Sequence, residues 1–295
     1  MSAVESSVRA TATDTSAAGG GRRRAVGVLT MLASGSSNQA GAALGALAFP
    51  VIGPVGVVAV RQFVAAAALL ALARPRFRTL ERRDWWPVLG LALTLGVMNL
   101  SLYMAVDRLG LALAVALEFL GPLAVAVGSS RRVVDGLCAV VAGVGVVTLT
   151  DPRPSSDYLG IAAGLLAASA WASYILLNRH LGRRLPGLQG SSVATLVSAA
   201  AWTPLAVGWF LLHPPTPAAI GLAVACGVLS SAVPYVADMV TLRHIPAALF
   251  GTFMSVNPVL AALVGWAVLE QVLTAREWLG IGLIVAANVV VTARR

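Results

Sequence analysis

Residues 109–128 read LGLALAVALEFLGPLAVAVG, and Glu118 is the only charged residue among them. A helix rises 1.5 Å per residue, so about 20 apolar residues cross a hydrocarbon core that is about 30 Å thick. Nine other segments share this character. The pattern predicts an all-α integral membrane protein with ten transmembrane helices, at residues 26–48, 54–73, 87–106, 109–128, 134–150, 158–178, 190–212, 217–241, 247–268 and 275–292.

The composition of the whole chain agrees with a lipid solvent. Of the 295 residues, 58% are hydrophobic and 11% are charged, whereas a soluble domain carries about 25% charged residues. The connections between the predicted spans are short, which leaves no room for a soluble catalytic domain. The net charge of +9 is spread over hairpin ends, so it indicates a lipid bilayer and not a nucleic acid as the partner.

The arginines predict the orientation of the chain. With a cytoplasmic N-terminus, all but four of the 21 basic residues fall in cytoplasmic segments, the exceptions being Arg61, Arg108, Arg153 and Arg276. The positive-inside rule therefore places both termini in the cytoplasm. Residues 1–25 hold almost no large apolar side chains, and we expect them to form a disordered cytoplasmic N-terminus.

The two halves of the chain match each other faintly. An ungapped match lays residues 105–122 on the second half at an offset of 136. Each half contains five predicted spans, an odd number, so the second half enters the membrane from the opposite face. We predict a first five-helix repeat over residues 26–150 and a second, inverted repeat over residues 151–295, as is typical of secondary transporters.

Polar residues and glycines recur at helical spacing in four of the predicted spans, and polar side chains there must face protein or water. The members are Ser34, Asn38, Gly41 and Gly45; Gly96, Asn99, Tyr103 and Asp107; Trp171, Tyr174 and Asn178; and Ser231, Tyr235 and Asp238. Any one of them could simply hydrogen-bond one helix to another, but together they indicate a wet cavity. The spans at 134–150 and 275–292 lack such stripes and are expected at the periphery.

Two charged residues lie deep inside the predicted spans, away from the span ends. Glu118 is near the middle of its span, where burial favours the neutral form of a carboxyl group. It fits a group that loads and releases a proton, and a permanently protonated or arginine-paired structural carboxyl is the alternative. Arg61 lies about seven residues inside its span and could pair with Glu118, extend outward to the interface, or bind a substrate carboxylate.

Two prolines interrupt helices at matching positions. Pro122 removes the N–H that would bond to the carbonyl of Glu118, and Pro258 does the same for Met254. In transporters such breaks supply bending points and free carbonyls, and simple packing kinks are the alternative. The predicted hinge residues are Gly121, Pro122, Asn257 and Pro258.

The remaining candidates for chemistry are few. Asp238 lies near the cytoplasmic end of its span and close to Arg243, so a gate or a surface ion pair is expected. Cys138 and Cys226 fall inside spans, where they behave as small apolar side chains. The three histidines lie at span ends, so no metal site, cofactor or enzyme active site is predicted.

Two runs of sequence resemble the drug/metabolite transporter superfamily: AVALEFLGPLAVAVGSSRRVVD, from Ala114 to Asp135, and FGTFMSVNPVLAALVGWAVLE, which ends at Glu270. More narrowly, they resemble its EamA-type branch and, within that branch, the bacterial inner-membrane threonine/homoserine exporter group. The resemblance covers residues 26–293. It implies ten helices in the bacterial cytoplasmic membrane, export of small hydrophilic amino acids, and drive by the proton gradient.

The resulting hypothesis is a secondary active transporter that works by alternating access and proton antiport. A small amino-acid or metabolite substrate would exchange with protons at Glu118, while Arg61 engages the substrate carboxylate. The other predicted substrate-binding residues are Asn38, Asn99, Tyr103, Trp171, Tyr174 and Tyr235. Efflux of other metabolites, or of cationic and apolar drugs held by cation–π contacts, is the alternative. The sequence is compatible with a monomer or a homodimer.

Overall fold

The structure is a computed structural model. It describes residues 27–294 apart from 74, 76–79, 131, 152, 154–155, 186–187 and 242–253, and for residues 238–241 it describes the backbone alone. The predicted N-terminal segment, residues 1–25, lies outside the described residues.

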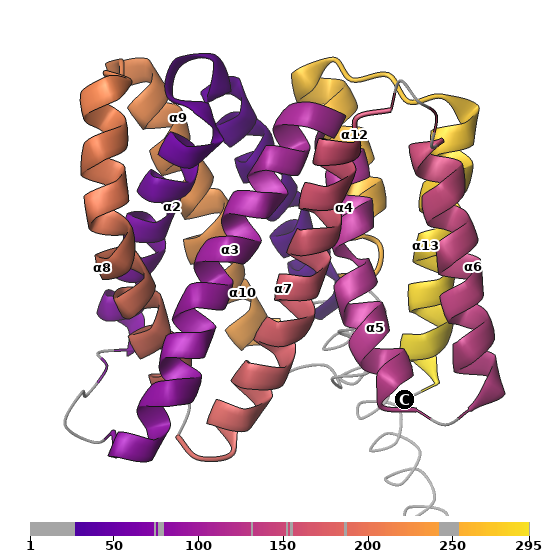
Figure 1. Ribbon diagram of the computed structural model, residues 1–295, viewed down its shortest axis with the longest axis horizontal. Helices are drawn as coiled ribbons and strands as arrows, with labels where there is room; N and C mark the ends of the chain where they lie inside the picture. Colours follow the sequence, from indigo (N-terminus) through magenta and orange to yellow (C-terminus); the bar gives the residue numbers. More distant parts are fainter. Residues whose placement is uncertain are drawn as a thin grey trace, which may run out of the picture.

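Across the described residues the chain is helical and contains no strand (Figure 1). A first helix covers residues 27–47. It is followed by α2 (Phe49–Ala73), η2 (Arg82–Asp84), α3 (Trp85–Leu109), α4 (Leu111–Glu118), α5 (Leu120–Gly128), α6 (Val133–Thr150), α7 (Tyr158–Gly182), α8 (Gln189–Leu212), α9 (Pro217–Gly227), η3 (Val228–Ala232), α10 (Val233–Thr241), α12 (Asn257–Leu269) and α13 (Ala275–Ala293). In this part of the chain, eight helical stretches are long and apolar enough to cross a membrane. The all-α membrane fold is confirmed, and the count of ten spans stays a prediction.

The helices match the predicted spans closely except where a span is interrupted. The span predicted at 109–128 consists of α4 and α5, which are separated at Phe119. The interruption coincides with the hydrogen bond that Pro122 removes. The span predicted at 217–241 contains the π-helical turn η3 between α9 and α10.

The predicted ninth span is described only in part. Its first residues, 247–253, lie outside the described residues, and α12 begins at Asn257 with a proline in its first turn. Pro258 therefore opens a helix here, where the missing N–H of a proline costs little.

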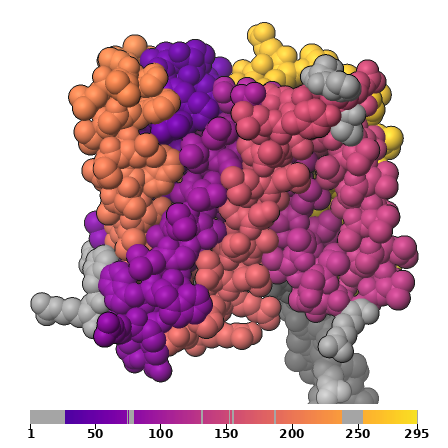
Figure 2. All heavy atoms as spheres, in the orientation of Figure 1, coloured from indigo at the N-terminus to yellow at the C-terminus, as the bar shows by residue number. Residues whose placement is uncertain are grey.

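The helices form one bundle with a regular pair at its edge. In Figure 1, α2, α8 and α9 stand on one side, α3 and α7 cross the middle, and α6 and α13 lie side by side at the opposite edge. Figure 2 shows α3 and α7 covering the middle of one face. The prediction that the spans at 134–150 and 275–292 are peripheral is confirmed.

The α6–α13 pair is held by close backbone contact. Gly145 of α6 faces Gly280 of α13, and a Cβ added to Gly280 would lie 2.8 Å from the carbonyl oxygen of Gly145. In a bilayer the hydrophobic effect does not drive helices together, because the lipid tails are as apolar as the side chains. Small residues stabilise a helix pair instead, because they let the two backbones approach and make packing contacts. Asn288, the main polar side chain of this pair, donates to the carbonyl of Ile284 in its own helix at 3.0 Å.

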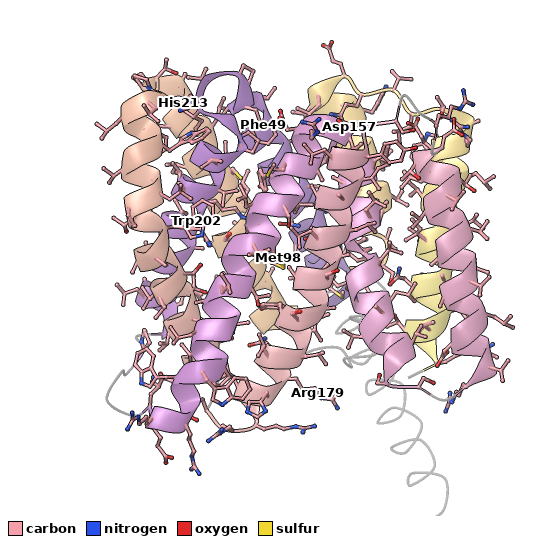
Figure 3. The ribbon with its side chains drawn as sticks, in the orientation of Figure 1. Phe49, Met98, Asp157, Arg179, Trp202 and His213 are labelled. Carbon is pink, nitrogen blue, oxygen red and sulfur yellow. The ribbon has the colours of Figure 1, made fainter. Side chains whose placement is uncertain are left out.

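The bundle has two distinct ends. Figure 3 places Phe49, Asp157 and His213 at one end, Arg179 at the other, and Met98 between them. We call these the Phe49 end and the Arg179 end. A large buried apolar cluster, which includes Ile52 of α2, fills the half of the bundle towards the Phe49 end.

The loop after α12 is fastened to the beginning of α4. The side-chain oxygen Oε1 of Gln271 accepts a hydrogen bond from the backbone N–H of Leu111 at 3.0 Å, and its own backbone N–H donates to the carbonyl of Gly265 at 3.1 Å. A helix N-terminus leaves its first N–H groups without helical partners, so Gln271 satisfies one of them. Gly110 turns the chain into α4 at φ 86°, a left-handed conformation that favours glycine.

Candidate functional site

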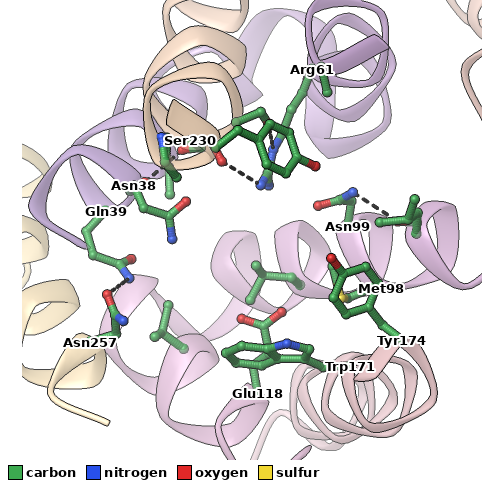
Figure 4. A pocket seen from close by; sticks show the side chains of 18 of the residues that line it. Asn38, Gln39, Arg61, Met98, Asn99, Glu118, Trp171, Tyr174, Ser230 and Asn257 are labelled. Carbon is green, nitrogen blue, oxygen red and sulfur yellow. Dashed lines mark hydrogen bonds between the residues drawn. The ribbon is translucent and has the colours of Figure 1, made fainter. Parts of the chain in front are cut away.

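A cavity of about 200 Å³ lies in the middle of the bundle, and Met98 is part of its wall (Figure 4). Polar groups from both halves of the chain meet there. They are Asn38 and Gln39 of the first helix, Arg61 and Gln62 of α2, Asn99 of α3, Glu118 of α4, Trp171 and Tyr174 of α7, Thr195 of α8, Ser230 and Ser231 of η3, Tyr235 of α10 and Asn257 of α12. A cavity with a polar lining is therefore present, and it is lined by more helices than the four stripes indicated.

Arg61 reaches the cavity from α2 and is held by groups of η3 and α3. Its Nε donates to Ser231 Oγ at 3.3 Å, and a terminal nitrogen donates to the carbonyl oxygen of Ser230 at 3.3 Å. Its guanidinium carbon lies 5.4 Å from the centre of the Tyr103 ring, within reach of a cation–π contact. These bonds use two of the five N–H donors of an arginine, so the others are left for a ligand or water.

The partners of Arg61 belong to an irregular turn. In the π-helical turn η3 the backbone hydrogen bonds no longer follow the α-helical pattern, as often occurs at functional sites. The carbonyl of Ser230 accepts from Arg61, and the carbonyl of Leu229 accepts from Ser37 Oγ at 2.9 Å. Ser230 Oγ donates to the carbonyl of Asn38 at 2.7 Å. The turn thus joins the first helix, α2 and the second half of the chain.

Glu118 is the last residue of α4, directly before the interruption at Phe119. Its side chain lies in the cavity wall and is 8% exposed. It forms no ion pair and no hydrogen bond with any described residue. Figure 4 shows Glu118 and Arg61 on opposite sides of the cavity. The pairing of these two residues, one of the three alternatives for Arg61, is therefore not formed in this structure.

Aromatic side chains flank Glu118. The rings of Phe119 and Trp171 meet edge to face with their centres 4.8 Å apart, and Tyr174 follows one helical turn after Trp171 in the same wall. Aromatic faces attract cations, and a carboxyl group beside them adds to that attraction. This side of the cavity is suited to a positively charged group.

Amide side chains occupy another side. Gln39 Nε2 donates to Asn257 Oδ1 at 3.4 Å, and Asn257 Nδ2 donates to the carbonyl of Met254 at 2.9 Å. That carbonyl is the one that Pro258 deprives of its helical partner. The carbonyl predicted to be free at the second break is therefore occupied by Asn257.

Most of the predicted site residues lie in the cavity wall: Asn38, Arg61, Asn99, Glu118, Trp171, Tyr174, Tyr235 and Asn257. Tyr103, predicted to bind substrate, is fully buried next to Arg61 and is not part of the wall, and its hydroxyl pairs with the sulfur of Cys226 at 3.0 Å. Asp238 falls in α10, but its side chain lies outside the described part of the structure.

The predicted hinge residues have local reasons for their identity. A Cβ added to Gly121 would meet the carbonyl oxygen of Ala168, so this glycine lets α5 lie directly on the backbone of α7. Pro122 lies in the first turn of α5, just after the interruption at Phe119. Pro258 is the second residue of α12 and so also lies in a first turn.

Sequence reasoning missed four polar residues of the wall, namely Gln39, Gln62, Thr195 and Ser230. Gln62 donates to Ser198 Oγ at 2.9 Å and joins α2 to α8. An uncharged polar residue next to Arg61 inside a span was a usable signal, because polar groups in a membrane need partners. Ser230 gave no such signal, because its role depends on the π-helical turn.

Metal ligands are not grouped in the described part of the chain. Within it, no three His, Cys, Asp or Glu side chains lie together as a metal site requires. Cys138 and Cys226 are buried free thiols. The polar groups that line the cavity are hydrogen-bond donors and acceptors.

Comparison with known proteins gives one family match and several relatives. The model of the EamA-like transporter family matches residues 158–293. The chain is 36% identical over 272 residues to the threonine/homoserine exporter RhtA of Salmonella typhimurium, covering 88% of this chain and 89% of the relative. It is 35% identical over 267 residues to RhtA of Escherichia coli, with the same coverage.

Two more distant likenesses extend over most of the chain. The uncharacterized transporter YwfM of Bacillus subtilis is 26% identical over 255 residues, which are 81% of this chain and 84% of the relative. One crystal structure shares the fold with a TM-score of 0.62 and 18% identity, covering 90% of this chain and 95% of that one. At this identity the likeness concerns the fold alone.

Proposed function

The chain belongs to the EamA-like transporter family and is not an enzyme, and we propose that it exports small hydrophilic amino acids of the threonine and homoserine type. The observation that carries the proposal is the placement of two opposite charges, Arg61 and Glu118, on opposite sides of a small cavity in the middle of a membrane bundle. Neither side chain forms an ion pair with a described residue. The names of the relatives found in Salmonella typhimurium and Escherichia coli supply the substrate type.

The size of the cavity favours a small substrate. Its volume of about 200 Å³ lies below the roughly 300–1,000 Å³ of pockets that hold drug-sized ligands. An arginine without an acidic partner in the wall also disfavours a cationic drug and favours a carboxylate, which a guanidinium binds through two parallel hydrogen bonds.

Drive by proton antiport centres on Glu118. A carboxyl group that is buried without a partner is more stable when it is protonated than when it is ionised. Glu118 would carry the proton in one direction and release it when the cavity opens to the other side. The interruptions at Phe119 and before Asn257 are the places where α4–α5 and α12 would bend.

Two contacts support the ten-helix, inverted-repeat architecture. Gln62 and Ser198 are hydrogen-bonded and are 136 residues apart, the offset that relates the two halves. The contact of α6 with α13 also joins positions that the repeat relates. A second sequence match between the halves, at an offset of 142, lays α6 on α13. At this offset Gly145 corresponds to Ala287 and Gly280 to Cys138, and just as the two glycines face each other, Ala287 and Cys138 share a buried cluster.

The charges at the two ends of the bundle support an orientation with both termini in the cytoplasm. At the Phe49 end, the described arginines Arg108, Arg153 and Arg276 are paired with Asp157 or Asp151. The described arginines towards the Arg179 end are more numerous, namely Arg82, Arg83, Arg132, Arg179, Arg183, Arg184 and Arg294. By the positive-inside rule the Arg179 end faces the cytoplasm of a bacterial inner membrane.

The test is flux of radiolabelled threonine and homoserine in vesicles that hold the purified protein, with and without an imposed pH gradient. We expect gradient-driven flux in the wild type and none in Glu118→Gln. The matched control is Asp107→Asn, the same change of carboxyl to amide at an exposed side chain near the Phe49 end of α3. Normal gradient-driven flux in Glu118→Gln would remove Glu118 from the coupling step.

Efflux of cationic or apolar compounds is the second candidate, and the aromatic wall of Phe119, Trp171 and Tyr174 favours it. The same vesicles distinguish the two functions. Flux of a quaternary-ammonium dye without flux of either amino acid would replace the amino-acid proposal with drug efflux.

A further inference from the structure

The two charged side chains of the cavity are supported in different ways. Arg61 is fixed by two hydrogen bonds to η3 and by the ring of Tyr103, so its direction is set before a ligand arrives. Glu118 has no polar partner among the described residues. The structure therefore holds one preorganised cation and one carboxyl group that lacks a counterpart.

A carboxylate buried without a partner is unfavourable, and a cation that enters beside it relieves the cost. Arg61 acts on Glu118 only across the cavity and forms no ion pair with it (Figure 4). Space for a small molecule lies between them. The missing cation is thus one that a ligand brings.

The surroundings of Glu118 match an ammonium group. Trp171 and Tyr174 stand in the same wall, and the ring of Trp171 is fixed by its edge-to-face contact with Phe119. Ammonium groups bind favourably over aromatic faces next to a carboxylate. The opposite wall presents the free N–H groups of Arg61, which suit a carboxylate.

We infer that the cavity recognises both charges of an α-amino acid, with the α-ammonium group held by Glu118 beside Trp171 while Arg61 holds the carboxylate. The inference rests on the proposed function and deepens it. It adds that Glu118 contacts the substrate, whereas proton coupling alone requires no such contact. Compounds that lack the amino group are therefore excluded even when their carboxylate and side chain are those of threonine.

The experiment measures binding without a proton gradient, by competition against radiolabelled threonine on purified, detergent-solubilised protein. The competitors are 2,3-dihydroxybutanoate, in which a hydroxyl replaces the ammonium group, and threoninol, in which an alcohol replaces the carboxylate. A charge-assisted hydrogen bond corresponds to roughly 10- to 100-fold in affinity. We expect each competitor to bind the wild type more weakly than threonine by about that factor.

Variants assign each preference to its residue. In Glu118→Gln, threonine should bind roughly 10- to 100-fold more weakly while 2,3-dihydroxybutanoate is hardly affected, so the preference between them disappears. Ligand-induced thermal stabilisation gives this ratio if binding of the label becomes too weak. Arg61→Gln should no longer prefer threonine over threoninol but should still prefer threonine over 2,3-dihydroxybutanoate. Glu118→Asp should keep both preferences for threonine. Asp107→Asn is the control and should bind all three compounds as the wild type does.

The outcomes separate this inference from the function on which it rests. If the wild type binds 2,3-dihydroxybutanoate as tightly as threonine, or if Glu118→Gln keeps the wild-type preference, the inference is wrong and the exporter proposal stands. If the wild type binds neither threonine nor homoserine, the proposed substrate is wrong, and the inference is overturned with it.

Discussion

The α6–α13 pair at the edge of the bundle and the helices around the cavity are built by opposite rules. α6 and α13 are uninterrupted, almost entirely apolar, and joined through facing glycines. The cavity is lined instead by helices that are broken at Phe119, widened at η3 and newly begun at Asn257. Regular structure thus provides the frame, and each irregularity places a polar group or a carbonyl in the cavity.

This difference teaches where substitutions will act. Breaks and buried polar groups cost stability, and they are concentrated where a ligand would repay the cost. The edge pair has no break and only two buried polar side chains, Asp135 and Asn288, and it contributes mainly packing. Substitutions around the cavity should therefore change transport more than stability, and substitutions in the edge pair should do the reverse.

After Glu118→Gln, the largest effect on transport is expected from Arg61→Lys. A lysine keeps the charge but cannot bond Ser230 and Ser231 together and still offer a planar fork to a carboxylate. We expect the KM for threonine to rise roughly 10- to 100-fold, with a small change in the melting temperature. Initial rates of flux and thermal unfolding check this, and an unchanged KM would show that Arg61 does not bind the carboxylate.

A smaller and opposite effect is expected in the edge pair. In Gly280→Ala the new Cβ would lie 2.8 Å from the carbonyl of Gly145, and overpacking of this kind costs about 1–3 kcal/mol. The melting temperature should fall, while flux per folded molecule stays near that of the wild type. Gly282→Ala is the matched control on the same helix, because a Cβ there meets nothing within 4 Å. Equal melting temperatures for the two variants would contradict the close contact.

The fold was largely predictable from the sequence. Apolar length placed the helices, and Pro122 placed the interruption between α4 and α5, because a missing N–H has a local and predictable consequence. The turn η3 was not predictable, since Val228–Ala232 contains neither Gly nor Pro, and the turn is hydrogen-bonded to Ser37 and Arg61. Those contacts come from helices remote in the sequence.

The site was predictable where polarity alone decides. Glu118, Arg61 and Asn38 lie in the cavity wall as the cost of polar groups in lipid predicts. Tyr103 shows where this reasoning stops. A helical stripe predicts which face of a helix turns towards the cavity, but not whether a side chain on that face reaches the cavity wall. Tyr103 stops short of the wall because it packs against Arg61 and Cys226.

The smallest effect is expected from Asp157→Asn, which lies outside both regions at the Phe49 end. The backbone N–H of Gly160 and the guanidinium of Arg108 hold the pKa of Asp157 below its ordinary value of 3.8. A lowered pKa in the folded state adds stability above the ordinary value and loses it as the pH falls through the folded value. Wild type should therefore melt slightly above Asp157→Asn at neutral pH, and the difference should shrink as the pH falls below the ordinary value of 3.8. A constant difference across that range would show that charge is not the cause.

The bond from Leu111 to Gln271 also has a consequence for biosynthesis. The two residues are 160 positions apart, and the chain is made from its N-terminus. When the ribosome has finished α4, the residue that completes its first turn does not yet exist, and neither do Ser230 and Ser231, which fix Arg61. The first half therefore lacks these contacts while the second half is being made, and the cavity forms only after synthesis of the second half.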